Sequence, residues 1–210
     1  MRAFKTEGII LKRKNFGEAD RILTVFTVSK GKVSVLARGV RKITSRRAGN
    51  IELLNRVQMY LHQGKNFLIL TEASSINTFQ KLKEDLTLST YAYHILEATD
   101  KLTAENQENS LLYADLVEVL NKLSEKPRQI LVRAYEVKVL THMGFWSVEN
   151  LQELNSKIKE LLQILEYGTW DQIENVSVNQ TQALELERIL RYYLEKIIES
   201  PLKSRQLLKK

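Results

Sequence analysis

The sequence contains no cysteine among its 210 residues. This absence excludes disulfide bonds, zinc sites built on thiolates, iron–sulfur clusters and cysteine nucleophiles. A long apolar run is also missing: the first run, Gly8 to Leu11, is short, and Lys12, Arg13 and Lys14 close it. No stretch approaches the roughly 20 apolar residues that span a bilayer, and the start lacks the pattern of a signal peptide. We therefore expect a cytoplasmic protein.

The motifs of common enzyme classes are absent as well. The sequence has no glycine-rich phosphate loop of the Walker or Rossmann type and no Gly-x-Ser-x-Gly elbow. His62, His94 and His142 lie far apart and outside any metal-binding spacing, so we expect them to be structural. Glu18 and Asp20 could form a metal-binding pair, although ion pairs with nearby arginines explain them more simply. We predict a protein that is not an enzyme and needs no metal or cofactor.

Positive charge is present in excess, and it is unevenly distributed. Residues 1–79 contain 15 Lys and Arg against 5 Asp and Glu, a net charge of +10. The remaining residues contain 17 against 20, a net charge of −3, and together they give the +7 of the whole chain. A strongly basic segment next to a mildly acidic one indicates a polyanion as the partner of the basic segment.

Residues 1–79 have the pattern of a small β domain. Six of the eight glycines lie here, and short alternating runs are separated by turn signals. Val33, Val35 and Ala37 are expected to face one way and the residues between them the other. Five strands are predicted, at residues 4–13, 21–28, 32–38, 56–63 and 67–73. A sheet this small leaves exposed edges unless it closes, which favours an OB-fold barrel, with an SH3-like barrel as the alternative.

From residue 80 onward the apolar residues recur with a helical period. Five apolar stripes predict five helices, and they lie at residues 88–102, 112–123, 130–137, 151–165 and 186–197. We expect Pro127 in the first turn of the third helix and Gly144 at its end. Ser147 should cap the fourth helix, Asn179 should open the fifth with a capping box, and Pro201 should end it. The chain is thus predicted to be an α+β protein with a barrel at 1–79 and an all-α domain at 80–210.

The densest positive charge follows the third predicted strand. Gly39 allows the chain to turn there, and Arg41, Lys42, Arg46 and Arg47 follow within a few residues. A basic loop next to a sheet is suited to contact with a polyanion, although a solvated loop without a partner is the alternative.

Aromatic residues are interleaved with the basic ones in this part of the chain. They are Phe4, Phe16, Phe26, Tyr60 and Phe67. Some of them must fill the barrel, whereas an exposed one could stack on a base. Phe16 and Tyr60 are the candidates for stacking, and packing within the fold is the alternative for each.

Several segments, taken together, resemble the RecO family of bacterial recombination mediators. They are TEGIILK at residues 6–12, GEADRILTVFT at 17–27, GKVSVLARGVRK at 31–42, SR at 45–46, YEVKVLTHMGF at 135–145 and PLKSR at 201–205. The resemblance lies in their order and spacing along the chain. It implies an N-terminal OB-fold and a C-terminal helical domain. It also implies binding of single- and double-stranded DNA, annealing of complementary strands, and assistance in loading the recombinase onto strands coated by single-strand-binding protein.

Applied to this sequence, the resemblance also implies particular residues and partners. The implied DNA-binding residues are Arg38, Arg41, Lys42, Arg46, Arg47, Lys12, Lys14 and Lys32. The implied protein partners are RecR and the acidic C-terminal tail of single-strand-binding protein. A groove between helices with cations at its rim would suit such a tail. The residues expected at that rim are Arg128, Arg133 and Lys138, with solvated surface charges as the alternative.

One segment departs from the family pattern. Many family members carry a four-cysteine zinc module after the glycine that Gly144 matches, whereas residues 146–179 contain no cysteine. We expect one helix and a loop there and no structural zinc. Two other functions remain open: an RNA-binding accessory factor with an OB-fold, and a protein–protein adaptor whose basic barrel docks an acidic protein. A nuclease would require carboxylates that hold a metal.

Overall fold

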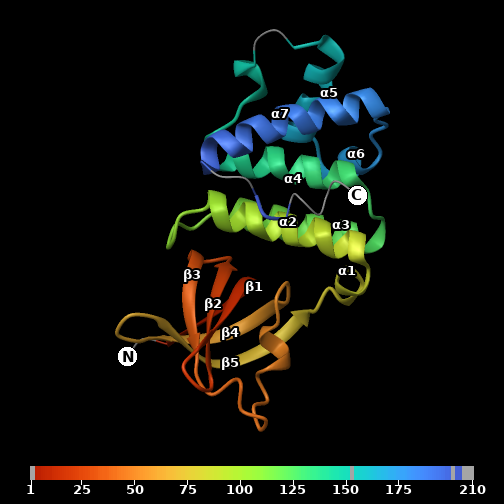
Figure 1. Cartoon of the computed structure of the whole chain (residues 1–210). Helices are drawn as coiled ribbons and strands as arrows, with labels where there is room; N and C mark the ends of the chain where they lie inside the picture. The colour runs from red at the N-terminus through yellow and green to blue at the C-terminus, as the bar shows by residue number, and fades with distance from the viewer. Residues whose placement is uncertain (1–2, 152–153, 200–201, 205–210) are drawn as a thin grey trace. The chain divides into compact units, whose positions relative to one another are not determined.

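The structure, a computed structural model, describes residues 3–151, 154–199 and 202–204. Five strands come first and helices follow, so the predicted α+β class is confirmed (Figure 1). Contacts within the chain divide it into a barrel unit, Met1–Gln80 with Thr103–Tyr113, and a helical unit, Lys81–Leu102 with Ala114–Lys210. None of the described helices has the length and apolar character needed to cross a membrane.

The barrel unit is a closed five-stranded barrel with the strand order β1-β2-β3-β5-β4. Its strands are β1 (Ala3–Phe16), β2 (Asp20–Thr27), β3 (Gly31–Ala37), β4 (Arg56–Gln63) and β5 (Leu68–Asn77). Neighbouring strands are antiparallel except β3 and β5, whose short parallel pairing closes the barrel. The OB-fold, one of the two barrel types expected, is therefore confirmed.

Strand β1 is long because it pairs with two partners. Its first half pairs with β4 and its second half with β2, and an irregularity between Ile10 and Lys12 lets it bend from one to the other. The predicted alternation is confirmed, since Val33, Val35 and Ala37 are buried in the barrel core. Apolar residues from all five strands fill this core, together with residues of the loop after β3: Ile10, Leu23, Val25, Val40, Ile51, Val57, Met59, Leu61 and Leu70.

Residues 103–113 pack against the outer surface of β2 and β3. Gly31, at φ +62°, lies so close to this segment that a Cβ atom would be 1.8 Å from the carbonyl oxygen of Gln107. The N–H of Asn106 donates to the carbonyl of Lys32 at 2.8 Å, and Tyr113 lies 6.2 Å from Phe26 between ring centroids. A glycine is therefore required at position 31 for both its backbone angle and its lack of a side chain.

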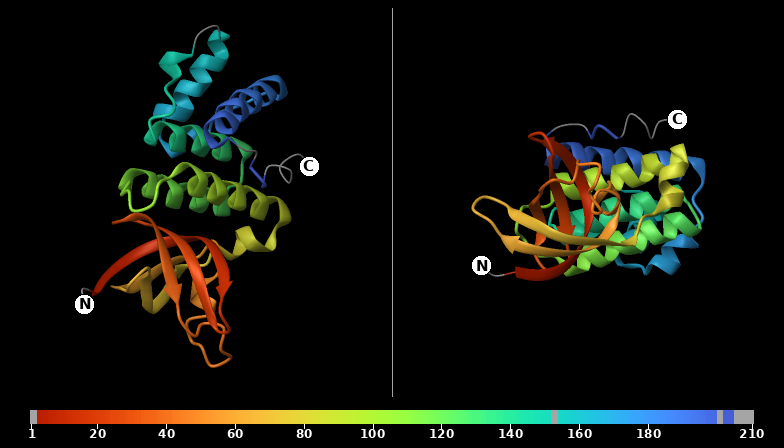
Figure 2. Two further views of the ribbon diagram at one scale, coloured as in Figure 1. Left: turned by 60° about the vertical axis from the view of Figure 1, so that its left-hand side comes forward. Right: turned by 90° about the horizontal axis from the view of Figure 1, so that it is seen from below.

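Helix α4 is the centre of the helical unit. The helices are α1 (Gln80–Glu84), α2 (Leu86–Leu102), α3 (Ser110–Glu125), α4 (Gln129–His142), α5 (Ser156–Tyr167), α6 (Trp170–Glu174) and α7 (Gln180–Ile198). Helix α4 packs against α2, α5, α6 and α7 and lies between α2 and α7 (Figures 1 and 2). It is buried on nearly every face from Ile130 to Leu140, and its two buried charged side chains, Arg133 and Glu136, pair with each other.

The ends of several helices follow the predicted signals. Gly144, at φ +75°, ends α4, with its N–H donating to Thr141 and the N–H of Phe145 donating to Leu140. This is the hydrogen-bond pattern of a Schellman motif. Asn179 forms the predicted capping box with Gln182 at the start of α7. Pro201, expected to end α7, lies outside the described residues.

Other helix boundaries differ from the prediction. Pro127 precedes α4 rather than lying in its first turn. Ser147 makes no cap: a short 3₁₀ turn, η2 (Val148–Asn150), follows it, and α5 begins only after Asn155, which is the actual cap. The reason is a tertiary contact: Glu166 of α5 accepts the N–H of Val148 at 2.8 Å, the group that a Ser147 cap would leave inside the first helical turn.

Residues 146–179 also contain a helix that was not predicted. Thr169 and Gln172 form a reciprocal capping box at the start of the short helix α6. The expected single helix and loop are therefore replaced by η2, α5 and α6. The indole N–H of Trp146 donates to Glu166 at 3.2 Å, which ties the start of this segment to α5.

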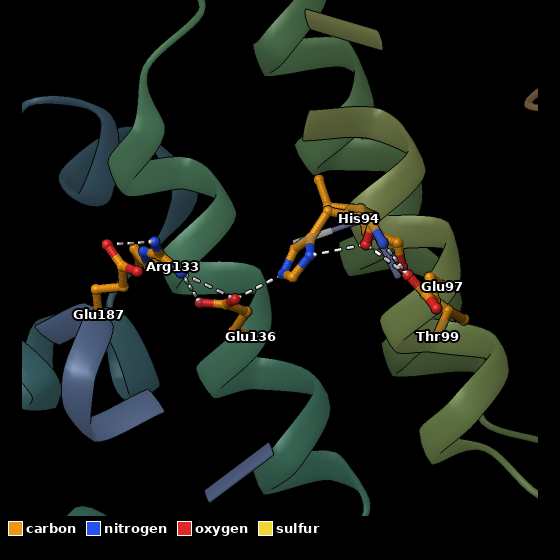
Figure 3. Close-up of polar contacts among 8 residues, drawn as sticks. His94, Glu97, Thr99, Arg133, Glu136 and Glu187 are labelled. Carbon is orange, nitrogen blue, oxygen red and sulfur yellow. Dashed lines mark hydrogen bonds and ion pairs between the residues drawn. The ribbon is translucent and has the colours of Figure 1, made fainter. Parts of the chain in front are cut away.

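A chain of polar contacts lies inside the helical unit, as Figure 3 shows. Glu136 on α4 is 1% exposed and lies 3.0 Å from the guanidinium of Arg133 and 2.6 Å from Nε2 of His94 on α2. Arg133 also lies 3.6 Å from Glu187 on α7. Burial alone would raise the pKa of Glu136, but the charge of Arg133 and the hydrogen bond from His94 lower it to about 2.

The same chain of contacts holds residues 202–204 to α2. Nδ1 of His94 lies 3.1 Å from Oγ of Ser204. The carboxylate of Glu97 accepts the backbone N–H groups of Lys203 at 2.9 Å and of Ser204 at 2.8 Å. Burial alone would raise the pKa of Glu97, and these hydrogen bonds, with that of the Ser204 hydroxyl, lower it instead.

Candidate nucleic-acid interface

The loop after β3 carries the densest positive charge of the barrel unit. Residues 38–47 contain five cations and no acidic residue, and the loop extends from one end of the barrel (Figure 1, orange). Four of these cations are exposed: Arg38, Arg41, Lys42 and Arg46. Within the part of the chain that the structure describes, the side chains of Arg38, Lys42 and Arg46 make no hydrogen bond or ion pair. Their charges therefore face solvent.

Arg47 is positioned differently from the other four cations of the loop. Its guanidinium donates to three backbone carbonyls: those of Leu70 at 2.8 Å, Thr71 at 3.3 Å and Arg38 at 2.8 Å. These bonds tie the loop to β5 and to the end of β3. Arg47 thus shapes the loop that presents the other cations, a role that sequence reasoning did not anticipate.

The loop is also fastened to the turn between β1 and β2. The N–H of Arg41 donates to the carbonyl of Ala19 at 2.9 Å, and its guanidinium donates to the carbonyl of Gly17 at 3.2 Å. The carboxylate of Asp20 accepts the N–H of Gly39 at 2.7 Å. The basic loop and the end of β1 therefore form one continuous surface.

Strand β1 adds two lysines and an aromatic ring to this surface. Lys12, Lys14 and Phe16 are exposed and alternate along the strand, so all three side chains lie on its outer face. The prediction ended this strand at Arg13 and therefore did not extend the alternation to Phe16. The row places two cations and a ring beside the basic loop.

Lys32, on β3, is less exposed than the four exposed cations of the loop. It is half-buried, and residues 103–113 pack alongside it. The backbone N–H of Asn106 donates to the carbonyl of Lys32, and Lys32 and Glu105 form an isolated parallel β-bridge through their backbones. Lys32 thus lies beside a segment of the same chain that contains Glu105 and Glu108.

Two other arginines of this end of the barrel are paired with a carboxylate. Arg13 and Arg21 both contact Glu52, the latter at 3.2 Å. The expected pairing of these arginines with Glu18 or Asp20 is therefore wrong. Among the described residues there is also no group of three or more histidines and acids that could hold a metal.

The two aromatic candidates for stacking are exposed but lie apart. Phe16 is 47% exposed at the end of β1, and Tyr60 is 41% exposed on β4. Tyr60 pairs across the sheet with Lys5, near the start of β1, and the Lys5 ammonium lies 5.6 Å from the centre of its ring. Phe26 is fully buried and Phe4 packs against the core. Only Phe16 adjoins the basic loop.

In the helical unit, two of the three predicted rim cations line one hollow. Its volume is about 230 Å³, and it is lined by Arg128, Gln129, Ile130, Arg133, Val178, Ala183 and Leu186. Arg128 also donates to the carbonyls of Glu174 and Val176, the latter at 2.7 Å. Lys138 lies elsewhere, with its ammonium 3.3 Å from the carbonyls of Glu166 and Gly168. The structure thus brings Arg128 and Arg133 together but not Lys138.

Comparison with known proteins matches both units. The family model described as recombination protein O N terminal matches residues 1–79, and the one described as recombination protein O C terminal matches residues 83–146 and 147–206. Three relatives named DNA repair protein RecO are similar. That of Roseiflexus sp. (strain RS-1) is 37% identical over 145 residues, 69% of this chain and 51% of the relative. That of Acetivibrio thermocellus is 36% identical over 148 residues, which are 69% of this chain and 59% of the relative.

The third relative, from Bacillus cereus (strain AH187), is 33% identical over 141 residues, 67% of this chain and 57% of the relative. The matched region therefore spans between half and six-tenths of the length of these relatives. The two family models nevertheless match most of this chain. The chain belongs to the RecO family of DNA repair proteins.

Proposed function

We propose that this chain is a DNA-binding recombination mediator that acts without catalysing a chemical reaction. It would bind single- and double-stranded DNA, anneal complementary strands and assist recombinase loading on strands covered by single-strand-binding protein. The observation that carries the proposal is the surface of exposed cations formed by residues 38–46 with Lys12 and Lys14 of β1. RecR and the acidic tail of single-strand-binding protein would be its protein partners.

The mechanism is electrostatic capture of the sugar–phosphate backbone. Each cation that neutralises a phosphate releases counterions, and the planar fork of an arginine can grip a phosphate with two hydrogen bonds. The DNA-binding residues we propose are Arg38, Arg41, Lys42, Arg46, Lys12, Lys14 and Lys32, with Arg47 holding the loop in shape. Phe16 is placed to stack on a base next to the gripped phosphates. Two strands bound close together with their repulsion screened would anneal.

The salt dependence of binding tests this mechanism. If about five of these seven cations contact phosphates at once, the slope of log affinity against log salt should be roughly −3 to −4 on single strands. Replacing Arg38, Arg41, Lys42 and Arg46 together by alanine should reduce most of that slope. Arg47 is left in place because its loss would also disturb the loop backbone.

A variant with the same change in net charge serves as the control. Lys81, Lys101, Lys157 and Arg188 are exposed cations of the helical unit, and their replacement by alanine should leave the slope nearly unchanged. Equal slopes for the loop variant and the wild type would remove the loop from the mechanism. Matched DNA and RNA strands at one salt concentration would separate this proposal from the RNA-binding alternative. Weak binding of both at physiological salt would favour the protein–protein adaptor.

We further propose that the hollow beside Arg128 and Arg133 receives the acidic, Phe-ended tail of single-strand-binding protein. Ile130, Val178 and Leu186 supply an apolar lining for a ring. Arg128 supplies positive charge for the tail carboxylates, since Arg133 is buried and already paired with Glu136 and Glu187. Calorimetric titration of the tail peptide into the full chain should show binding that Ala183→Phe abolishes by filling the hollow. Lys138→Ala tests whether the docking surface extends to that residue. Binding that persists in Ala183→Phe would place the tail elsewhere.

A further inference from the structure

Ile43 is the most exposed of the large hydrophobic residues in the described chain, with a relative exposure of 105%. Isolated exposed apolar residues are common on proteins and need no explanation by themselves. This one is unusual in its surroundings, because it lies within the run of five cations and no acid at residues 38–47. An apolar side chain is thus presented at the point where the barrel unit is most positively charged.

The backbone around Ile43 is ordered by two consecutive turns. The N–H of Lys42 donates to the carbonyl of Gly39 at 3.2 Å, and the N–H of Ser45 donates to the carbonyl of Lys42 at 2.9 Å. Ile43 therefore occupies the second position of a turn, with its side chain directed into solvent. The Arg47 bonds to β5 and the Asp20 bond to Gly39 hold the base of the loop. An anchored loop loses less conformational entropy on binding than a free one.

We infer that Ile43 is an apolar wedge that inserts between two adjacent base pairs of duplex DNA held by the basic loop. Branched apolar side chains that enter a base step unstack it and gain the free energy of their own burial. The cations on both sides of Ile43 would hold the phosphates that flank the opened step. The inference rests on the proposed DNA binding and adds the residue through which the loop would disturb base stacking.

The surroundings favour a nucleic acid over a lipid surface as the occupant. Stable anchoring to a membrane needs more buried apolar area than one side chain provides. A base step, in contrast, accepts a single wedge residue. Anionic vesicles are nevertheless included in the test as a competing surface.

The test compares wild type, Ile43→Ala and Ile43→Leu in the full chain, with Leu184→Ala as the control. Leu184 on α7 is also largely exposed, at 62%, but lies in the helical unit. A duplex containing 2-aminopurine reports unstacking by a rise in fluorescence. Wild type and Ile43→Leu should raise the fluorescence, and Ile43→Ala should not. Ile43→Ala should weaken duplex binding roughly tenfold at every salt concentration, as expected for partial loss of apolar burial.

The slope of affinity against salt separates the wedge from the phosphate contacts. Ile43→Ala removes no cation, so its slope should equal that of the wild type while its affinity is lower. Two results would refute the wedge and leave DNA binding standing. One is unchanged duplex affinity and fluorescence in Ile43→Ala. The other is that Ile43→Ala loses binding to anionic vesicles but not to duplex DNA. If wild type binds no duplex DNA, the proposed function and the wedge both fail.

Discussion

Replacing Arg133 by methionine should destabilise the helical unit by about 3–5 kcal/mol. The guanidinium lies 3.0 Å from both carboxylate oxygens of Glu136, which is buried on the same helix. Methionine fills similar space but leaves Glu136 with a charge inside the protein and only His94 as a polar neighbour. The cost arises from this uncompensated buried charge rather than from the lost ion pair itself.

Set against burial, which would raise it, the low pKa of Glu136 reflects the combined effect of Arg133 and His94 on its charge. The pKa falls from its ordinary 4.5 to about 2 on folding, and at 1.36 kcal/mol for each pKa unit this corresponds to about 3 kcal/mol. Because the pKa is lowered in the folded state, the unfolded chain takes up the proton first as the pH falls. The stabilisation is therefore complete above about pH 4.5, is reduced by roughly 2 kcal/mol at pH 3, and is lost near pH 2.

Urea unfolding followed by tryptophan fluorescence measures these effects, because Trp146 and Trp170 both belong to the helical unit. The double variant Arg133→Met with Glu136→Leu should recover most of the stability at pH 7, and it should lose less stability than the wild type between pH 7 and pH 3. Arg188→Met, at an exposed position on α7, is the control and should stay within about 0.5 kcal/mol of the wild type. A single variant within 1 kcal/mol of wild type, or a double variant no better than the single, would contradict the reasoning.

Three further outcomes are expected from the contacts described. Gly31→Ala should lower the unfolding free energy by about 2–5 kcal/mol. Gly17 has a similar φ but nothing within 4 Å of an added Cβ, so Gly17→Ala should lower it by only about 1 kcal/mol. Equal losses would mean that residues 103–113 do not lie against β3. Arg47→Ala should speed amide hydrogen exchange in residues 39–46, and unchanged exchange would show that its carbonyl bonds do not order the loop. Glu97→Gln should speed exchange of the N–H groups at residues 203 and 204 and lower stability by about 1–2 kcal/mol, which thermal unfolding would detect.

The barrel could be predicted from sequence because its pattern is local. Alternation of period two identified all five strands, and for β4 the predicted and observed bounds agree. The prediction ended β1 too early because residues 15–17, Asn-Phe-Gly, have the composition of a break, whereas the strand continues to Phe16. The parallel pairing of β3 with β5 joins segments far apart in sequence. The number of strands did not predict it and left the SH3-like barrel open.

The helical unit shows where local signals fail. Asn179 caps a helix as its sequence indicates because the partner, Gln182, is three residues away. Ser147 has an equally good local context, but the carboxylate of Glu166 on α5 accepts the N–H of Val148, the residue that follows it. Arg133 was expected at a surface rim, and its sequence neighbours do not reveal the second contact, with Glu187, that comes from another helix.

The candidate site also has features that local sequence predicts and features that depend on long-range contacts. The exposed cations of residues 38–46 are neighbours in sequence, so any fold would bring them together. Lys12, Lys14 and Phe16 alternate in the sequence, but the prediction ended the first strand at Arg13 and so did not place Phe16 on the same face. The hydrogen bonds of Arg47 to backbone carbonyls and the packing of residues 103–113 on β3 join residues far apart in sequence, so no local sequence pattern predicts either.

The distribution of carboxylates explains why the positive charge of the barrel unit is concentrated in one loop. Residues 1–79 have only five acidic side chains. Glu52 contacts Arg13 and Arg21, and Glu7 lies 2.8 Å from Arg56. These two acids thus pair with arginines of β1, β2 and β4. The cations of residues 38–46 receive no such partner among the described acids, so the excess charge remains where a polyanion can reach it.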